Sequence, residues 1–200
     1  MPSSDDTCTR GEILKQAAKL FAQRGFDAVS VREIVEAAGC TKPSLYYHFE
    51  SKEGLALALM GEFIEAAVTA RTRAFAQAVD AEGAFVLFGR EMLKLAVKFK
   101  DTLAFGFSIW FGRSSLKSLM ARVEETDRKA YEEWHKALVR LGMSPTVAMT
   151  AVRAYWSMLL HELMQVVQCP KWKGNPEEVS QQITRVVLHG VLSLEPVRKR

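Results

Sequence analysis

Five side chains that can form hydrogen bonds lie within seven consecutive residues near the start of the chain. They are Lys42, Ser44, Tyr46, Tyr47 and His48. Two apolar residues among them, Leu45 and Phe49, are four apart, so a helix here would bury one side and turn the polar residues outward. An ammonium group, hydroxyls and an imidazole on one exposed surface can meet base edges and phosphates. The pattern predicts a short helix suited to a DNA groove.

The residues before this segment predict the elements that position it. Ser30 and Glu33 have the spacing of a capping box, which starts a helix. Gly39 can adopt the left-handed conformation that ends one. Thr41 can accept hydrogen bonds from the free amides of a new first turn, and Pro43 stands where a missing N–H costs nothing. The prediction is two short helices joined by a tight turn.

Apolar residues recur at helical spacing along the rest of the chain, without any strand or hairpin pattern. The predicted helices cover residues 9–23, 30–38, 41–49, 51–79, 84–100, 103–111, 116–141, 144–168 and 175–194. Nine helices without a strand predict an all-α fold.

Charge alone does not explain DNA binding by this chain. Its 200 residues are 48% hydrophobic and carry a formal net charge of +4. Residues 1–52 nevertheless hold seven basic and seven acidic residues, and the tail 198–200 supplies three of the positive charges. Any DNA binding must therefore depend on where charges sit rather than on their sum.

The sequence also predicts a cytoplasmic location. Cys8, Cys40 and Cys169 are too scattered for a disulfide framework or a zinc site, which indicates a reducing compartment. The polar, acidic opening of the chain does not resemble a secretory signal. No apolar run is long enough to span a membrane, so we expect no membrane contact.

No motif of catalysis or cofactor binding is present. His161 and Glu162 begin like a zinc-protease helix, but Gln165 stands where a second histidine is required. We expect no enzymatic activity and no cofactor. A helical enzyme and a metal sensor stay open as alternatives, although the spacing of the candidate ligands does not support a metal site. Those ligands are His135, His161, Cys169 and His189.

The last two predicted helices are apolar on more than one side. Their main stripes contain Val152, Trp156, Leu159, Leu163 and Val167, then Ile183, Val187 and Val191. Helices of this kind must be buried on more than one side, and pairing with the same helices of a second copy achieves that. We expect a homodimer with a two-fold four-helix interface. A monomeric bundle with a wide core is the alternative.

The stretch VREIVEAAGCTKPSLYYHFESKEGL, together with ILKQAAKLFAQRGFDAVS before it, resembles the TetR family of transcriptional regulators. The resemblance covers about the first quarter of the chain. It implies a helix-turn-helix DNA-binding domain over residues 1–52 and a helical ligand-binding and dimerisation domain over residues 53–200. It also implies a repressor that binds a palindromic operator in double-stranded DNA as a homodimer and that a small molecule releases. An activator or a co-repressor-dependent regulator of the same fold stays open.

The resemblance assigns DNA contacts to ten positions. They are Ser30, Arg32, Thr41, Lys42, Pro43, Ser44, Tyr46, Tyr47, His48 and Lys52. Lys52 matches a phosphate contact, while Lys42 can read guanine acceptors in the major groove. Structural alternatives remain, because Tyr46 can pack against the first helix and His48 can stack locally. Lys52 can also pair with a neighbouring glutamate.

The resemblance places an effector site among the C-terminal helices, where aromatic residues are concentrated. The candidate lining residues are Phe85, Phe88, Phe105, Phe107, Trp110, Phe111, Met120, Trp134, Tyr155, Met158 and His161. Most aromatic residues at helical spacing are ordinary core residues, so only part of this set is expected to face a ligand. Few charged residues lie among them, which favours an apolar or aromatic effector. His161 can instead belong to a polar cluster at the dimer interface.

Overall fold

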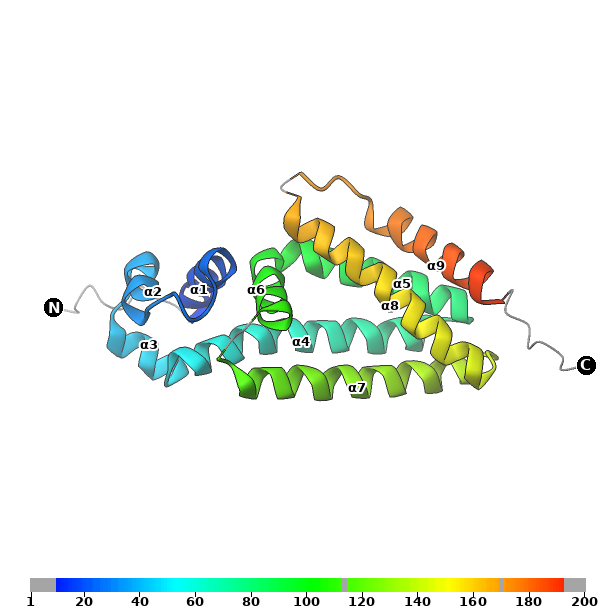
Figure 1. Ribbon diagram of the computed structural model, residues 1–200, viewed down its shortest axis with the longest axis horizontal. Helices are drawn as coiled ribbons and strands as arrows, with labels where there is room; N and C mark the ends of the chain where they lie inside the picture. Colours follow the sequence, from blue (N-terminus) through cyan, green and yellow to red (C-terminus); the bar gives the residue numbers. More distant parts are fainter. Residues whose placement is uncertain (1–9, 113–114, 170, 193–200) are drawn as a thin grey trace, which may run out of the picture. The chain divides into compact units, whose positions relative to one another are not determined.

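A computed structural model describes residues 10–112, 115–169 and 171–192 of the chain; within these, the side chains of 117–120, 122–124, 127, 191 and 192 are not described. The described parts contain nine helices and no strand (Figure 1), which confirms the predicted all-α fold. The helices are α1 (Arg10–Arg24), α2 (Val31–Ala38), α3 (Lys42–Phe49), α4 (Lys52–Gln77), α5 (Ala81–Lys98), α6 (Lys100–Phe111), α7 (Lys117–Arg140), α8 (Pro145–Gln168) and α9 (Pro176–Leu192).

Side-chain caps set several of the helix starts. The Oγ of Ser51 accepts from the amide of Gly54 at 2.9 Å at the start of α4. Asn175 Oδ1 accepts from the amide of Glu177 at 2.9 Å at the start of α9. Asp80 accepts from the amide of Gly83 at 2.7 Å, so α5 begins three residues before the predicted start. The sequence signal for this cap was present, because aspartate satisfies free amides in a first helical turn.

The chain forms two compact units. Unit 1 comprises Met1–Glu65 and Phe99–Val123, and unit 2 comprises Ala66–Lys98 and Glu124–Arg200. Both α4 and α7 contribute residues to each unit. The compact units are thus divided at a different place from residue 52, where the functional division was predicted, and that functional division stays a prediction.

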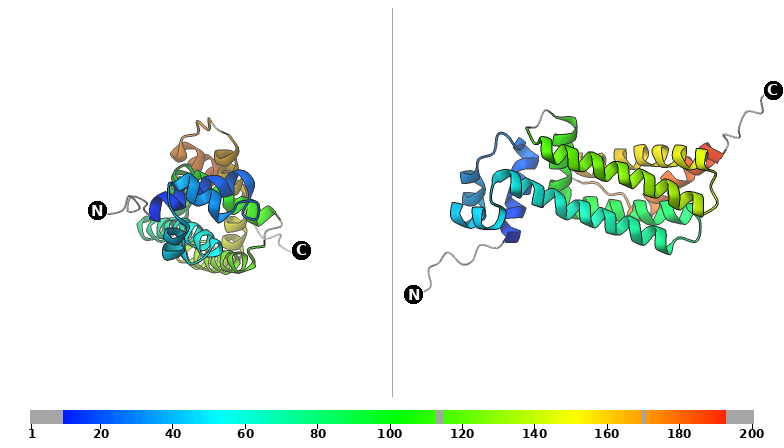
Figure 2. Two further views of the ribbon diagram at one scale, coloured as in Figure 1. Left: turned by 90° about the vertical axis from the view of Figure 1, so that its left-hand side faces the viewer. Right: turned by 90° about the horizontal axis from the view of Figure 1, so that it is seen from below.

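Unit 1 is built around the side chain of Phe21 in α1, which is 0% exposed. Its ring lies 5.4 Å from that of Phe26, in the loop after α1, and 5.0 Å from that of Phe105 in α6. Helix α6 packs against α1, and the apolar sides of α2, α3 and the first half of α4 complete the same core (Figure 2). One core therefore holds the predicted helix-turn-helix and α6 together.

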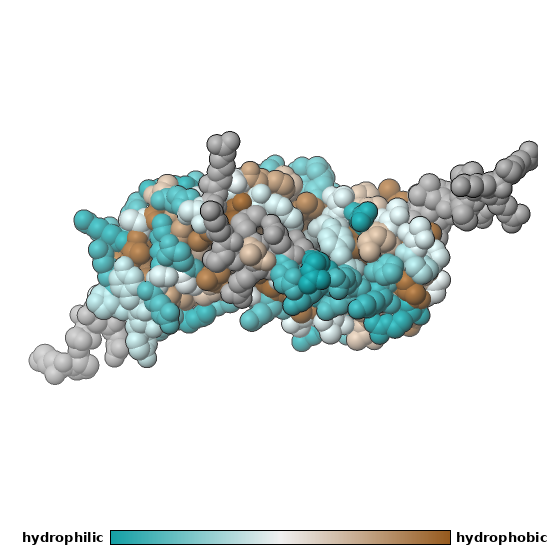
Figure 3. Space-filling model, turned by 60° about the horizontal axis from the view of Figure 1, so that its bottom comes forward, coloured by the Kyte–Doolittle hydropathy of each residue, from teal (hydrophilic) through white to brown (hydrophobic). Residues whose placement is uncertain are grey.

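Unit 2 has an aromatic core centred on Trp134 of α7. The rings of Phe75, Phe85, Phe88 and Tyr155 lie 4.7–5.7 Å from its indole. The close packing of α5, α8 and α9 around these rings accounts for their burial. Hydrophilic residues are widespread on the face of the molecule shown in Figure 3, with hydrophobic residues scattered between them.

A buried polar cluster lies beside these rings. The hydroxyl of Tyr155 donates to the carbonyl of Phe85 at 2.6 Å and lies 3.3 Å from the hydroxyl of Ser180, which donates to the carbonyl of Val86 at 2.8 Å. Burial raises the pKa of Tyr155 above its usual range. Gly89 of α5 allows this close approach, because a Cβ at that position would overlap the Tyr155 hydroxyl. The cluster ties α5, α8 and α9 together.

Most of the predicted dimer residues are already covered within one chain, and the interface itself stays a prediction. Five of them are buried in the core of unit 2 itself: Val152, Leu159, Leu163, Ile183 and Val187. Side chains packed between α5, α8 and α9 of one chain cannot also form a surface for a second copy. Trp156 and Val167 are half-buried, and Val191 lies outside the described side chains. The chain itself covers most of the main stripes, so an interface on these helices would use their other sides.

No helix among the described residues is both long and apolar enough to cross a membrane.

Candidate DNA-binding surface

A complete capping box starts α2. The hydroxyl of Ser30 accepts from the amide of Glu33 at 3.3 Å, and the Glu33 carboxylate accepts from the Ser30 amide at 2.8 Å and its hydroxyl at 2.7 Å. Arg24 adds an ion pair to Glu33 at 2.6 Å and donates to the carbonyl of Ala28 at 3.0 Å. These contacts fix the entry to α2 but occupy the Ser30 hydroxyl, which was predicted to meet DNA.

Hydrogen bonds to its carboxylate lower the pKa of Glu33 to about 2. The largest come from the backbone and side chain of Ser30, and the next from Arg24. A carboxylate with a lowered pKa stabilises the fold above its unfolded pKa of about 4.5, and this contribution is lost as the pH falls towards 2. We expect Glu33→Gln to lower the melting temperature of the protein at pH 7. The difference from wild type should shrink between about pH 4.5 and 2. Thermal melting of both proteins at a series of pH values measures this difference in melting temperature. A difference that does not change with pH would contradict the stabilising role of the Glu33 carboxylate.

The turn between α2 and α3 has the predicted geometry. Gly39 has φ of 65°, in the left-handed region, and its amide donates to the carbonyl of Glu36. Thr41 is the N-cap of α3, with its hydroxyl accepting from the amide of Ser44 at 3.4 Å, and Pro43 lies in the first turn. A Cβ is disfavoured at a φ of this sign, so glycine suits the turn.

Helix α3 presents a polar outer surface because its two apolar residues are buried. Leu45 is 0% exposed and Phe49 is 5% exposed, and both belong to the core of unit 1. Tyr47 is 85% exposed and Tyr46 is 47% exposed. Lys42 and Pro43 are exposed as well. We call these four residues, Lys42, Pro43, Tyr46 and Tyr47, the α3 surface.

Three other predicted contacts lie at the edge of the α3 surface. Thr41 and Ser44 are half-buried, in keeping with their use as the helix cap. The half-buried His48 ring lies edge-on to Tyr47 at 5.2 Å and tilted to Phe49 at 6.0 Å. The local stacking that was the alternative for His48 is therefore present in the structure.

Most described cations of unit 1 near this surface have an acceptor inside the unit. Arg32, which is exposed on α2, pairs with Glu36 at 2.6 Å. On α1, the pairs are Arg10 with Glu62 at 2.7 Å and Lys15 with Glu12 at 3.6 Å. Exposed pairs of this kind contribute little to stability, so a phosphate can compete for Arg32. Among the described residues, Lys42 has no acidic group within ion-pair distance.

Lys52, predicted to contact a phosphate, has hydrogen-bond acceptors inside the unit. Its ammonium donates to the carbonyls of Phe26 at 2.9 Å and Val29 at 2.8 Å. It also lies 4.1 Å from the centroid of the Phe26 ring, a cation–π distance. The group is half-buried and turned towards the α1–α2 loop. Its hydrogen-bond acceptors are therefore these two carbonyls rather than a neighbouring glutamate.

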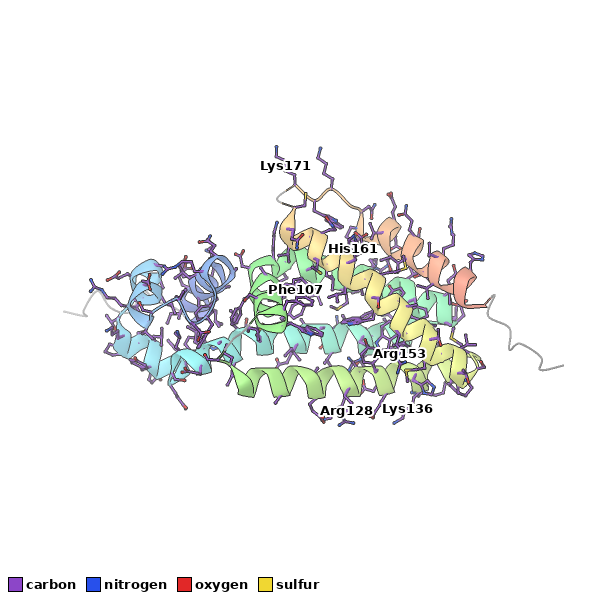
Figure 4. All side chains as sticks on the ribbon, in the orientation of Figure 1. Phe107, Arg128, Lys136, Arg153, His161 and Lys171 are labelled. Carbon is purple, nitrogen blue, oxygen red and sulfur yellow. The ribbon has the colours of Figure 1, made fainter. Side chains whose placement is uncertain are left out.

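The residues predicted to line an effector site lie in different parts of the structure. Phe85, Phe88, Trp134 and Tyr155 are core residues of unit 2, whereas Phe105 is buried against Phe21 in unit 1. A residue that lines an internal cavity is also buried, so the assignment of these five to an effector site stays a prediction. The exposed Trp, Tyr and Phe members of the predicted effector residues are Trp110 and Phe111, whose rings stack at 6.2 Å. Phe107 of α6 is half-buried (Figure 4), and its ring lies 6.2 Å from that of Phe111.

The other members of that set lie at or near the surface of unit 2. Met158 is half-buried on α8, and His161 is exposed on the same helix (Figure 4). The side chain of Met120 lies outside the described residues. In the described part of the chain, no group of three or more histidine, cysteine, aspartate or glutamate side chains is arranged to hold a metal ion.

Sequence reasoning missed a buried cation in unit 2. Arg71 of α4 is 7% exposed and pairs with the exposed Glu133 of α7 at 2.7 Å. Two residues close to this pair in the sequence, Phe75 and Trp134, stack edge-on at 5.0 Å. An arginine within an apolar helical stripe was the available signal, because such a residue needs a partner once buried.

Comparison with known proteins finds relatives for the N-terminal part of the chain. Residues 13–59 match the family model described as "Bacterial regulatory proteins, tetR family". The HTH-type transcriptional repressor KstR2 of Rhodococcus jostii is 44% identical over 68 residues, which are 32% of this chain and 33% of that protein. The HTH-type transcriptional activator FasR of Mycolicibacterium smegmatis is 34% identical over 89 residues, 44% of this chain and 37% of that protein. The matches thus span about a third of each relative.

The whole fold also has counterparts among solved structures. The TetR-family regulator PfmR from Thermus thermophilus superimposes with a TM-score of 0.72, over 92% of this chain and 98% of that one, at 24% identity. These relatives are named as regulators and not as enzymes. The sequence match over α1–α4 and the shared helical fold lead to one conclusion: residues 13–59 form a TetR-family segment, in a chain whose fold is similar to that of solved TetR-family regulators.

Proposed function

We propose that the protein is a sequence-specific transcriptional repressor that binds a palindromic operator as a homodimer. The observation that carries this proposal is the α3 surface, in which an ammonium, a proline ring and two phenols are turned outward by the burial of Leu45 and Phe49. A short helix with that exposed face matches the major groove in width and chemistry.

Each member of the α3 surface has a physical role in this proposal. Lys42 donates to guanine N7 and O6, and Pro43 meets the methyl group of thymine. The Tyr46 and Tyr47 rings supply apolar contact to bases while their hydroxyls reach phosphates or base edges. Arg32 exchanges its exposed partner Glu36 for a phosphate and so sets the register of the unit on the duplex.

Dimerisation supplies two α3 surfaces for two half-sites. The faces of α8 and α9 that the monomer leaves uncovered include Val186, which is 57% exposed, and the half-buried Trp156 and Val167. We propose that these faces pair about a two-fold axis. The two recognition helices then read successive major grooves about one helical turn apart.

We further propose that a small apolar or aromatic molecule binds in the C-terminal helices and releases the operator. The ligand would favour a conformation in which α4, which contributes to both units, holds the two α3 surfaces at the wrong separation. Activation remains the second candidate for the sign of regulation, because one of the relatives is named as an activator.

The proposal is tested on a duplex selected by the wild-type protein from a random library. We expect Lys42→Ala to weaken binding to this duplex by about tenfold or more, since a specific base contact is worth about 1–3 kcal/mol. Fluorescence anisotropy at fixed salt measures the dissociation constant. Lys15→Ala is the matched control, because it removes the same charge from an exposed side chain on α1 and should leave binding unchanged. A folded Lys42→Ala protein that binds as wild type would contradict the proposed site.

A further inference from the structure

The α1–α2 loop, residues 25–30, is held by side chains from three other parts of unit 1. Arg24 donates to the carbonyl of Ala28 from the end of α1. Lys52 donates to the carbonyls of Phe26 and Val29 from the start of α4. Ser115 donates through its hydroxyl to Asp27 at 2.5 Å from the segment between α6 and α7.

Lys52 makes the most buried of these contacts. Its ammonium has three N–H donors, two of which meet carbonyl oxygens while the group lies against the Phe26 ring. Phe26 is buried and packs on Phe21, so the cation is anchored to the core of the unit. Two of its three donors are therefore already used inside the unit, and a phosphate that took over the ammonium would have to compete with them.

The two hydrogen bonds of Lys52 connect segments next to two different helices. Lys52 follows the end of α3 by three residues, while Val29 immediately precedes Ser30, the N-cap of α2. The two hydrogen bonds therefore join the exit of the recognition helix to the entrance of the helix before it. The angle and separation of α2 and α3 depend on this connection.

We propose that Lys52 is a positioning residue that fixes α3 relative to α2 through the α1–α2 loop, and that it makes no phosphate contact. This inference rests on the proposed DNA-binding function. It replaces the phosphate role that the family resemblance implies for this position. Arg32, whose exposed guanidinium is held only by Glu36 among the described residues, remains the phosphate contact.

The salt dependence of binding separates the two roles. Each phosphate that a cation neutralises contributes about 0.9 to the slope of log affinity against log salt concentration. We expect Lys52→Met to weaken binding to the selected duplex by about tenfold at every salt concentration, with the wild-type slope. Arg32→Met is the matched control, and its slope should fall by about 0.9.

Two further measurements complete the test. Lys52→Met should lower the melting temperature by several degrees, because Phe26 and Val29 lose their donor. Lys52→Arg should restore most of the affinity, since a guanidinium can also donate to two carbonyls. A slope lowered by about 0.9 in Lys52→Met would overturn the proposal in favour of a phosphate contact, and unchanged affinity and melting temperature would overturn it as well.

The test also distinguishes failure of the inference from failure of the proposed function. If the wild-type protein selects no duplex from the library, the proposed function fails. Amide hydrogen exchange of residues 26–30 then decides the inference by itself. Faster exchange there in Lys52→Met than in Arg32→Met supports the positioning role, and equal exchange overturns it.

Discussion

Phe21→Ala is expected to destabilise unit 1 by about 3–5 kcal/mol, the range for removing a buried phenylalanine side chain. The Phe21 ring is fully buried and touches both Phe26 in the α1–α2 loop and Phe105 in α6. Its removal leaves a cavity where α1, α6 and this loop meet. Because α3 depends on the same core, operator binding should be lost together with stability.

Chemical denaturation followed by circular dichroism measures this effect. Phe21→Leu is the graded control, since it keeps most of the apolar volume and should be clearly less destabilising. Tyr47→Ala truncates an exposed aromatic residue and should leave the free energy of unfolding close to wild type. Equal stability of Phe21→Ala and Tyr47→Ala would show that the α1 core has been misassigned.

Gly89→Ala is expected to destabilise unit 2 by about 3 kcal/mol, by overpacking and by breaking buried hydrogen bonds. A Cβ on Gly89 would lie far inside van der Waals contact with the hydroxyl of Tyr155 and 2.5 Å from that of Ser180. Both hydroxyls are fixed by bonds to α5 carbonyls and cannot move away without leaving a buried polar atom unsatisfied. The substitution should therefore loosen the packing of α5 against α8 and α9.

Gly61→Ala is the control for this prediction. Gly61 also lies within a helix, but a Cβ there meets nothing within 4 Å. Alanine should raise stability slightly at such a site, because it favours the helix over the unfolded chain by roughly 0.5–1 kcal/mol. Thermal melting of both variants should show shifts of opposite sign. A shift of the same sign and size in both would refute the role assigned to Gly89.

The helix-turn-helix was predictable because its signals are local. The capping box of Ser30 and Glu33, the left-handed Gly39 and the Thr41 cap each act within three or four residues. Their hydrogen bonds join residues that are close neighbours in the sequence. The burial of Leu45 and Phe49 follows from their spacing alone, and it turns the polar side chains of α3 outward.

The partners of buried faces were not predictable in the same way. Helical periodicity indicates that Val152, Leu159 and Leu163 are covered, but it does not say whether the same chain or a second copy covers them. The structure shows that the same chain does. Lys52 illustrates the same limit, because its acceptors lie 23 and 26 residues earlier in the sequence. Nothing near Lys52 in the sequence indicates a contact with that loop.

The internal pairing of cations in unit 1 bears on the proposed binding to DNA. Arg10, Arg24, Arg32 and Lys52 all have acceptors within the unit. Affinity for non-matching DNA comes from cations that replace counterions on phosphates, and each of these four would first have to leave its internal acceptor. A genome offers on the order of a million or more such competing sites. Under the proposed function, internal pairing would therefore reduce the fraction of the protein that is held on non-matching DNA.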